Sequence, residues 1–281
     1  MDKLPEITIE MLIDRYEVLL LDAYGVLVHS SGIIAGAAEL IARLNRTPKP
    51  YYILTNDASR LPATAAARFQ SMGLAIESDR IITSGALLKG YFAKNRLTGS
   101  PCVVLGPEDS VRYVELAGGV VVSPENTFDV LVIGDESGFP FLDTVDTVLT
   151  GLIRKLDHGK NVHLVLPNPD LIYPKSDRGF GITGGSIALI LEAALHQRYP
   201  GRGNLHFDRL GKPQAVIFKE ALRRSGTRDM VMIGDQLATD IRGAHDFGLD
   251  SVLVGGGITH AAAITVGDHP LPTYVMPSIM L

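Results

Sequence analysis

A short segment near the start of the chain, Val18-Leu-Leu-Leu-Asp22-Ala-Tyr-Gly-Val-Leu27, constrains the fold and the chemistry more than any other. Four apolar residues that suit a buried strand are followed at once by an acidic residue and a glycine turn. In an open parallel sheet the carboxyl ends of the strands line the ligand crevice, so Asp22 is predicted to project into it. Asp22 is thus a candidate nucleophile; the alternative is a structural turn or a cap for the next helix.

Short runs of Val, Ile and Leu recur along the chain, with longer segments of helical periodicity between them. The runs predicted as strands are 18–21, 51–54, 102–105, 130–133, 162–166, 230–233 and 251–254, and the predicted helices are 36–45, 60–72, 84–95, 142–157, 186–197, 213–224 and 239–247. This alternation is typical of parallel βαβ units and predicts an α/β fold. The first, second and sixth runs end in Asp22, Thr55-Asn56 and Gly234-Asp235, which predicts a polar cluster at one edge of the sheet.

The length of the chain, 281 residues, exceeds that of the commonest single domain and favours two domains. Two Gly/Pro-rich breaks, at 95–101 and 198–204, bracket about a hundred residues with a strand and helix pattern of their own. We interpret this block as a domain inserted into the first one. Placed beside the strand ends, it would act as a lid that excludes water and contacts the substrate.

The composition bears on partners and location. A formal net charge of -5 and a pI near 5.9 give no broad basic field, so neither nucleic acid nor an anionic membrane surface is expected as a partner. No apolar run reaches the roughly 18 residues that a membrane helix needs. The one cysteine, Cys102, cannot form an internal disulfide, and the first ten residues lack a secretory pattern. These features predict a cytoplasmic protein with a small anionic ligand.

Two carboxylates flank a predicted strand-to-helix turn in the segment Val231-Met-Ile-Gly-Asp235-Gln-Leu-Ala-Thr-Asp240. Phosphoryl transfer through an enzyme carboxylate needs a nucleophile, a divalent cation and donors that neutralise the phosphate oxygens. Mg²⁺ prefers one or two carboxylates together with waters and substrate oxygens, so this pair suits a magnesium site. Asp235 is predicted to ligate the ion, and Asp240 to bind a coordinated water or orient the loop. The alternative for Asp240 is a helix cap.

Three further residues could hold a phosphoryl group. Thr55 and Asn56 close a predicted strand, where a hydroxyl and backbone N–H groups could bind phosphate at a helix N-terminus. Both residue types are also common in turns. Lys212 lies in Leu210-Gly-Lys-Pro213, a short loop fixed by its Gly and Pro that leads into the next predicted helix. A lysine held there can pair with phosphate and with the nucleophile, whereas most lysines are merely solvated.

Together these segments resemble the four ordered motifs of the haloacid dehalogenase (HAD) superfamily. The matching segments are Asp22-Ala-Tyr-Gly-Val for the nucleophile, Leu54-Thr55-Asn56 for phosphate binding, Gly211-Lys212-Pro213 for the lysine, and Gly234-Asp235 with Asp240 for the metal. The resemblance implies a Rossmann-like parallel-sheet core, Mg²⁺ as cofactor and an aspartyl-phosphate on Asp22. It also implies that the backbone carbonyl of Tyr24 ligates the metal together with Asp22 and Asp235.

The spacing of these motifs indicates where a cap domain is inserted. Asp22 and Thr55 are only 33 residues apart, whereas Thr55 and Lys212 are 157 apart, so the cap is of the C2 kind. The segments Val132-Ile-Gly-Asp135, Pro167-Asn168-Pro-Asp170 and Gly184-Gly-Ser186 are similar to those of the class IIA branch, which includes 4-nitrophenylphosphatase-like and phosphoglycolate phosphatase-like enzymes.

The class IIA resemblance implies a Rossmann-like core over residues 1–98 and 204–281 and an inserted α/β C2 cap over 99–203. In that branch the cap covers the active site, supplies specificity and often mediates homodimerisation. The resemblance also implies that Asn168 and Asp170 bind substrate; the alternative is a turn held by Asx hydrogen bonds.

Tyr24 departs from the family pattern. Family phosphatases carry a second aspartate two residues after the nucleophile, where it protonates the leaving alcohol and then activates water. A phenol is almost wholly protonated at neutral pH, so it can donate a proton but is a poor base. Loss of a general acid/base typically costs on the order of a hundred- to ten-thousand-fold in rate. Turnover is therefore expected to be weak.

The predicted function is a Mg²⁺-dependent phosphohydrolase that acts on a small phosphorylated metabolite, with Asp22, Tyr24 and Lys212 as catalytic residues. One alternative is a phosphate-ligand-binding or regulatory protein in which Tyr24 has abolished hydrolysis. Another is a 2-haloacid dehalogenase, because Asp-Ala-Tyr-Gly also occurs in those enzymes. Their cap follows the first motif, however, and they need no metal pair such as Asp235 and Asp240.

Two other segments are not assigned to the site. Asp135 and Glu136 are interpreted as solvated surface acids. Gly255-Gly-Gly257 lacks the spacing of a dinucleotide-binding loop, so no nucleotide cofactor is predicted.

Overall fold

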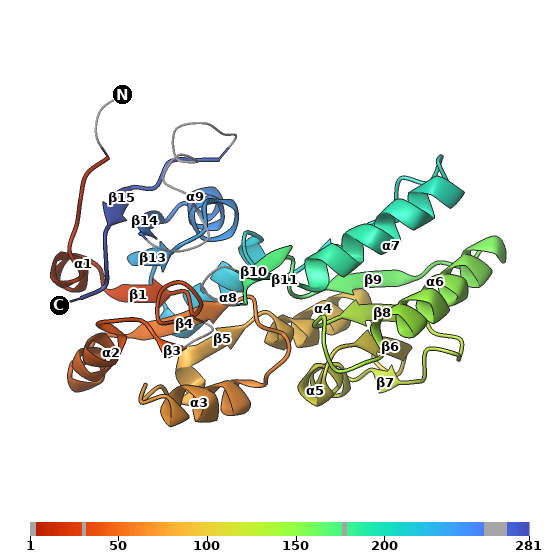
Figure 1. The fold of residues 1–281 in the computed structure, drawn as a ribbon, viewed down its shortest axis with the longest axis horizontal. Helices are drawn as coiled ribbons and strands as arrows, with labels where there is room; N and C mark the ends of the chain where they lie inside the picture. Colours follow the sequence, from red (N-terminus) through yellow and green to blue (C-terminus); the bar gives the residue numbers. More distant parts are fainter. Residues whose placement is uncertain (1–3, 30–31, 176–178, 256–268, 281) are drawn as a thin grey trace.

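The computed structural model describes residues 4–29, 32–175, 179–255 and 269–280. Within these residues the chain forms two larger β-sheets that lie side by side along the long axis of the molecule (Figure 1). The first has the strand order β15-β14-β13-β1-β4-β5, and all its pairings are parallel. Its strands are β1 (Val18–Leu21), β4 (Tyr51–Thr55), β5 (Ile81–Thr83), β13 (Met230–Gly234), β14 (Asp250–Val254) and β15 (Tyr274–Met276).

The second sheet has the order β12-β9-β8-β6-β7 and is also parallel throughout. Its strands are β6 (Pro101–Leu105), β7 (Val120–Val121), β8 (Val130–Ile133), β9 (His163–Leu166) and β12 (Asp208–Arg209). Because the first sheet is built from segments on both sides of these strands, the second is inserted in sequence. The predicted boundaries at 98/99 and 203/204 stay a prediction; β12 follows the second of them.

Helices flank both sheets and connect their strands. They are α1 (Ile9–Arg15), α2 (Ala37–Arg46), α3 (Pro62–Ser71), α4 (Leu88–Asn95), α5 (Glu108–Leu116), α6 (Phe141–Asp157), α7 (Gly184–Arg198), α8 (Ala215–Ser225) and α9 (Arg242–Phe247). Short 3₁₀ turns cover Ser78–Arg80 and Gly85–Leu87, and a π-helical turn covers Leu237–Ile241. Two hairpins complete the fold: β2 (Val28–His29) with β3 (Gly32–Ile33), and β10 (Ile172–Pro174) with β11 (Phe180–Ile182).

The apolar side chains form three main clusters. Along β1, Leu19 and Leu21 face a cluster with α1, α2 and α3, whereas Val18 and Leu20 face a second cluster with α4, α8 and α9. This alternation is what a strand buried on both faces requires. The second cluster also contains side chains from the inserted sheet, such as Cys102, so the inserted part and the core share apolar packing. A third cluster packs α6 and α7 against the inserted sheet.

The predicted α/β class, with a Rossmann-like parallel core and a second α/β unit, is confirmed. All seven predicted strands are present, each within one residue of its expected bounds. The helix predicted at 239–247 begins instead with the π-helical turn, and Gly256 and Gly257 of the glycine cluster lie outside the described residues. No helix in the described part of the chain is both long and apolar enough to span a membrane.

Candidate active site

The polar cluster predicted at the sheet edge lies at the carboxyl ends of three neighbouring strands. Asp22 follows β1, Thr55 ends β4 and Asp235 follows β13, and β1 pairs with both β4 and β13. The backbone N–H of Asp22 donates to the carbonyl of Ile233 at 2.9 Å, which continues the β1–β13 pairing up to the site. The parallel order of the sheet therefore brings these residues together from distant parts of the sequence.

Lys212 is the centre of the charged cluster. Its ammonium Nζ lies 2.7 Å from Oδ1 of Asp22 and 2.6 Å from Oδ1 of Asp240. All three side chains are buried. Such an arrangement fixes the nucleophile candidate against a cation, which agrees with the pairing expected from the sequence.

Asp235 and Asp240 face each other across the turn between β13 and α9. The Oδ2 atom of Asp240 accepts hydrogen bonds from the backbone N–H groups of Asp235 at 3.2 Å and Gln236 at 3.1 Å. Asp240 belongs to the π-helical turn, and its carboxylate lies next to the end of β13. A Cβ on Gly234 would lie only 2.3 Å from this carboxylate. Asp22, Asp235 and Asp240 each offer a carboxylate oxygen within 4.8 Å of the others.

The charges of this cluster do not balance, because it contains three buried carboxylates and one ammonium, which pairs with two of them. Burial, followed by the charge of Asp240, raises the pKa of Asp22 well above its usual range, and Lys212 opposes the rise. Burial lowers the pKa of Lys212, but Asp22 and Asp240 outweigh it, so the pKa of Lys212 is raised overall. Lys212 is thus a permanent cation, and the remaining negative charge is what a divalent cation would neutralise.

Asn56 joins the lysine loop to the inserted part of the chain. Its Oδ1 accepts from the backbone N–H of Lys212 at 2.7 Å, and its Nδ2 donates to the carbonyl of Lys212 at 3.1 Å and to Oδ1 of Asp170 at 2.9 Å. A Cβ on Gly211 would lie 2.4 Å from Oδ1 of Asn56, so this contact needs a glycine there. The side-chain amide is thereby engaged with protein groups, while its predicted role in phosphate binding stays a prediction.

Asn168 and Asp170 belong to a loop after β9 that reaches the core. The carbonyl of Pro167 accepts from Gly211 N–H at 3.0 Å, and Oδ1 of Asn168 accepts from Asp170 N–H at 3.1 Å, which is an Asx turn. Burial raises the pKa of Asp170 to about 6, although Lys212 and Asn56 oppose the shift. The structure therefore contains the turn and also places both side chains in the wall of the cavity described below.

Thr55 and Tyr24 complete the predicted set. The Thr55 hydroxyl accepts from Asp57 N–H at 3.2 Å at the start of the loop after β4. Tyr24 is half-buried, and the guanidinium of Arg68 lies 5.5 Å from the centre of its ring. Gly25 follows with a φ of +84°, and a Cβ there would lie 2.3 Å from Cγ of Asp235. The turn after the nucleophile therefore packs directly on the metal-ligand candidate.

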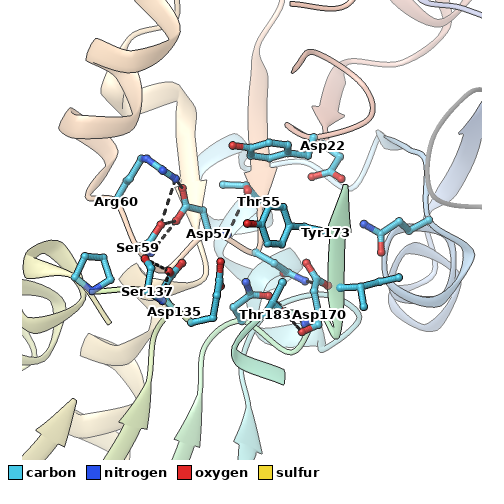
Figure 2. Close-up of a pocket in the computed structure, with 17 residues that line it drawn as sticks. Asp22, Thr55, Asp57, Ser59, Arg60, Asp135, Ser137, Asp170, Tyr173 and Thr183 are labelled. Carbon is cyan, nitrogen blue, oxygen red and sulfur yellow. Dashed lines mark hydrogen bonds and ion pairs between the residues drawn. The ribbon is translucent and has the colours of Figure 1, made fainter. Parts of the chain in front are cut away.

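A cavity of about 530 Å³ opens between the two sheets at this edge (Figure 2). Five predicted site residues contribute to its wall beside Asp22: Tyr24, Thr55, Asn56, Asn168 and Asp170. The sequence analysis assigned no role in the site to the other polar lining residues, which are Asp57, Ser59, Arg60, Asp135, Glu136, Ser137, Tyr173, Thr183 and Gln236. Asp135 and Glu136 thus line the cavity, although the sequence suggested solvated surface acids.

A signal for Asp135 was present in the sequence. It follows the apolar run of β8 through Gly134, as Asp235 follows β13 through Gly234. That pattern marks the carboxyl end of a parallel strand, but the sequence does not reveal that the carboxyl ends of the two sheets share one cavity.

Two family models match the chain. The haloacid dehalogenase-like hydrolase model covers residues 19–119 and the HAD-hydrolase-like model covers residues 209–280, together more than half of the chain. The chain belongs to the haloacid dehalogenase-like hydrolases. The gap between the two matches contains most of the inserted sheet of this HAD hydrolase.

Relatives of this HAD hydrolase are phosphatases. The dihydroxyacetone phosphatase of Corynebacterium glutamicum is 29% identical over 263 residues, which cover 92% of this chain and 88% of that protein. The acid sugar phosphatase of Staphylococcus saprophyticus is 25% identical over 267 residues, with coverages of 94% and 96%.

Solved structures that are similar to this chain are also described as phosphatases. A HAD superfamily protein from Cytophaga hutchinsonii, described as a possible sugar phosphatase, has a TM-score of 0.86 at 29% identity over 99% of both chains. The glycerol phosphate phosphatase of Mycobacterium tuberculosis in complex with calcium has a TM-score of 0.78 at 25% identity, covering 94% of this chain and 74% of that one. The predicted placement in the class IIA phosphatase branch is confirmed.

Proposed function

We propose that this HAD hydrolase is a Mg²⁺-dependent phosphatase that transfers the phosphoryl group of a small metabolite to Asp22 and then to water. One observation carries the proposal. The Lys212 ammonium lies within 2.7 Å of Asp22, and Asp22, Asp235 and Asp240 each offer an oxygen within 4.8 Å, beside a cavity large enough for a metabolite.

The donor set fits magnesium. Carboxylate and carbonyl oxygens are the ligands that Mg²⁺ prefers, and the cluster carries more negative than positive charge. Asp22, Asp235 and the backbone carbonyl of Tyr24 would hold the ion, while Asp240 would bind a coordinated water or orient the loop. When bound, Mg²⁺ would neutralise phosphate charge and hold the phosphate against the nucleophile.

The residues of the chain would act in two steps. An oxygen of Asp22 attacks phosphorus as the bond from phosphorus to the leaving oxygen breaks, and the Tyr24 hydroxyl donates a proton to that oxygen. Tyr24 then regains its proton from solvent. Water attacks the aspartyl-phosphate and releases a proton to solvent, the bond between the Asp22 oxygen and phosphorus breaks, and inorganic phosphate leaves. Thr55 and Lys212 hold the phosphoryl oxygens in both steps. Because a phenol is a poor base, the second step should limit turnover.

The substrate class follows from the cavity and from the relatives. A volume of about 530 Å³ lies in the range of sites for small molecules. The names of the relatives specify dihydroxyacetone phosphatase, acid sugar phosphatase and glycerol phosphate phosphatase activities. We therefore propose a small phosphorylated metabolite as substrate, with no nucleic acid or membrane as partner.

We further propose a homodimer formed through the inserted cap. Six large apolar side chains of the β10–β11 hairpin region and α7 are exposed: Leu171, Ile172, Phe180, Ile182, Leu189 and Ile190. The opposite face of α7 packs on its own sheet, so this helix is apolar on both sides, which favours a second contact. Sedimentation should show a dimer that Ile190→Lys dissociates; a monomeric parent chain would contradict the proposal.

Hydrolysis of 4-nitrophenyl phosphate tests the enzymatic proposal, because this good leaving group depends little on an acid. We expect activity with Mg²⁺, none with chelator, and none for Asp22→Asn. Asp143→Asn, an exposed acid on α6, is the matched control and should stay active. Binding of phosphate without hydrolysis would favour a regulatory protein, and release of halide from a 2-haloacid without Mg²⁺ would favour a dehalogenase.

A further inference from the structure

The inserted sheet contributes an acidic wall to the active-site cavity. Asp135 and Glu136 follow β8, and both are half-buried in that wall. Figure 2 shows Asp22 at one end of the group and Asp135 and Ser137 at the other, with Tyr173 between them. A phosphate ester bound at Asp22 would therefore have room to extend its organic part toward these carboxylates.

The acids of this wall outnumber its cations among the described residues. Among the described residues that line the cavity, Arg60 is the one with a positive side chain. Its Nη1 lies 3.0 Å from Oδ2 of Asp57, and its charge also acts on Asp135 and Glu136, so one cation faces three acids. The acidic wall therefore keeps a net negative charge.

Two hydrogen bonds from Ser137 hold the Asp135 carboxylate in this wall. Oδ1 of Asp135 accepts from the backbone N–H of Ser137 at 3.0 Å and from its hydroxyl at 2.6 Å, which holds the carboxylate in place. Burial, followed by the charge of Asp135, raises the pKa of Glu136, and Arg60 opposes the rise. The charge of Asp135 that contributes to this shift also opposes any other negative charge placed there.

We propose that Asp135 and Glu136 select phosphate esters whose organic part is uncharged and carries hydroxyl groups, and reject esters that carry a carboxylate. The inference rests on the proposed phosphatase function and deepens it. Hydroxyl groups can donate to the carboxylates, whereas a substrate carboxylate meets a wall of net negative charge in which Arg60 is already paired with Asp57.

A matched pair of substrates tests this selection. Glycerol 3-phosphate and 3-phosphoglycerate share a three-carbon skeleton, and the former has a hydroxymethyl group where the latter has a carboxylate. We expect kcat/KM to favour glycerol 3-phosphate by at least about tenfold at low salt, and less at high salt because ions screen the wall. In Glu136→Gln and in Asp135→Asn this ratio should fall several-fold. Glu115→Gln removes an exposed acid of α5 outside the cavity and should keep the ratio.

The outcomes separate the inference from the function on which it rests. If 4-nitrophenyl phosphate is hydrolysed but the two glycerol compounds react equally, or the carboxylate is preferred, the inference is wrong and the phosphatase proposal stands. If no ester is hydrolysed, the phosphatase proposal fails. Calorimetric titration of the two compounds into Asp22→Asn with Mg²⁺ then decides the inference by affinity: tighter binding of glycerol 3-phosphate supports it, and equal binding overturns it.

Discussion

Replacing Gly25 by alanine would test the position of the Asp235 carboxylate with a single methyl group. The Cβ would lie 2.3 Å from Cγ of Asp235, and an ordinary contact begins at 3.4 Å, so the carboxylate must move by about 1.1 Å. Mg²⁺ demands near-ideal geometry with oxygen ligands at about 2.0–2.1 Å, so this displacement removes a ligand. The alanine also occupies a φ of +84°, which costs about 1–2 kcal/mol of folding free energy.

We therefore expect Gly25→Ala to remain folded and to need at least about tenfold more Mg²⁺ for half-maximal hydrolysis of 4-nitrophenyl phosphate. At a fixed Mg²⁺ concentration kcat/KM should fall on the order of a hundredfold, as for other misplacements of about 1 Å. The assay is a Mg²⁺ titration of initial rates, supported by calorimetric titration of the metal and by urea unfolding.

Gly73→Ala is the matched control for backbone strain. Gly73 has a φ of +91°, and a Cβ there would meet nothing within 4 Å. It should lose a similar amount of stability and retain the Mg²⁺ response of the parent chain. A folded Gly25→Ala protein with the parent affinity for Mg²⁺ would refute the assignment of Asp235 as a metal ligand.

Three further substitutions probe the charges of the site. Lys212→Met leaves Asp22 and Asp240 uncompensated, so we expect loss of activity and about 3–5 kcal/mol less unfolding free energy, measured in urea, with part of the loss offset by Mg²⁺. The pKa of Asp170 is about 6 in the folded state and about 3.9 when unfolded, so its contribution makes stability fall as pH rises through that window; Asp170→Asn should remove this slope from urea midpoints, and an unchanged slope would contradict the assignment. Tyr24→Asp should increase the turnover of alkyl phosphates more than that of 4-nitrophenyl phosphate, because it restores an acid and base; an equal or smaller effect on alkyl phosphates would refute a proton-transfer role for residue 24.

The strands that carry the site were predictable from the sequence because each has four or five residues, nearly all apolar. β1 and β13 are examples, and both are wholly buried. The two-residue strands β7 and β12 were missed, since so short a stretch has no measurable periodicity. The π-helical turn before α9 was also missed: its apolar spacing resembles that of an ordinary helix, and its geometry serves the contacts of Asp240.

The parts of the site that could not be predicted from the sequence depend on contacts between residues far apart in the chain. The bonds of the Asn56 amide to Lys212 connect residues 156 positions apart, and no local pattern encodes them. Asp135 stands at a strand end in the sequence, but it and Glu136 become part of the cavity only because the carboxyl ends of both sheets meet there. The motif residues, in contrast, stand directly at strand ends, where parallel topology makes their convergence predictable.

The central claim is that Asp22 accepts the phosphoryl group. The most direct measurement is acid quenching of the protein during turnover of 4-nitrophenyl phosphate with Mg²⁺, followed by peptide mass spectrometry. We predict a phosphoryl group on Asp22 in the parent chain and none after chelation of the metal or in Asp22→Asn. Hydrolysis that proceeds with no phosphorylated Asp22, or with the phosphoryl group on another residue, would contradict the account.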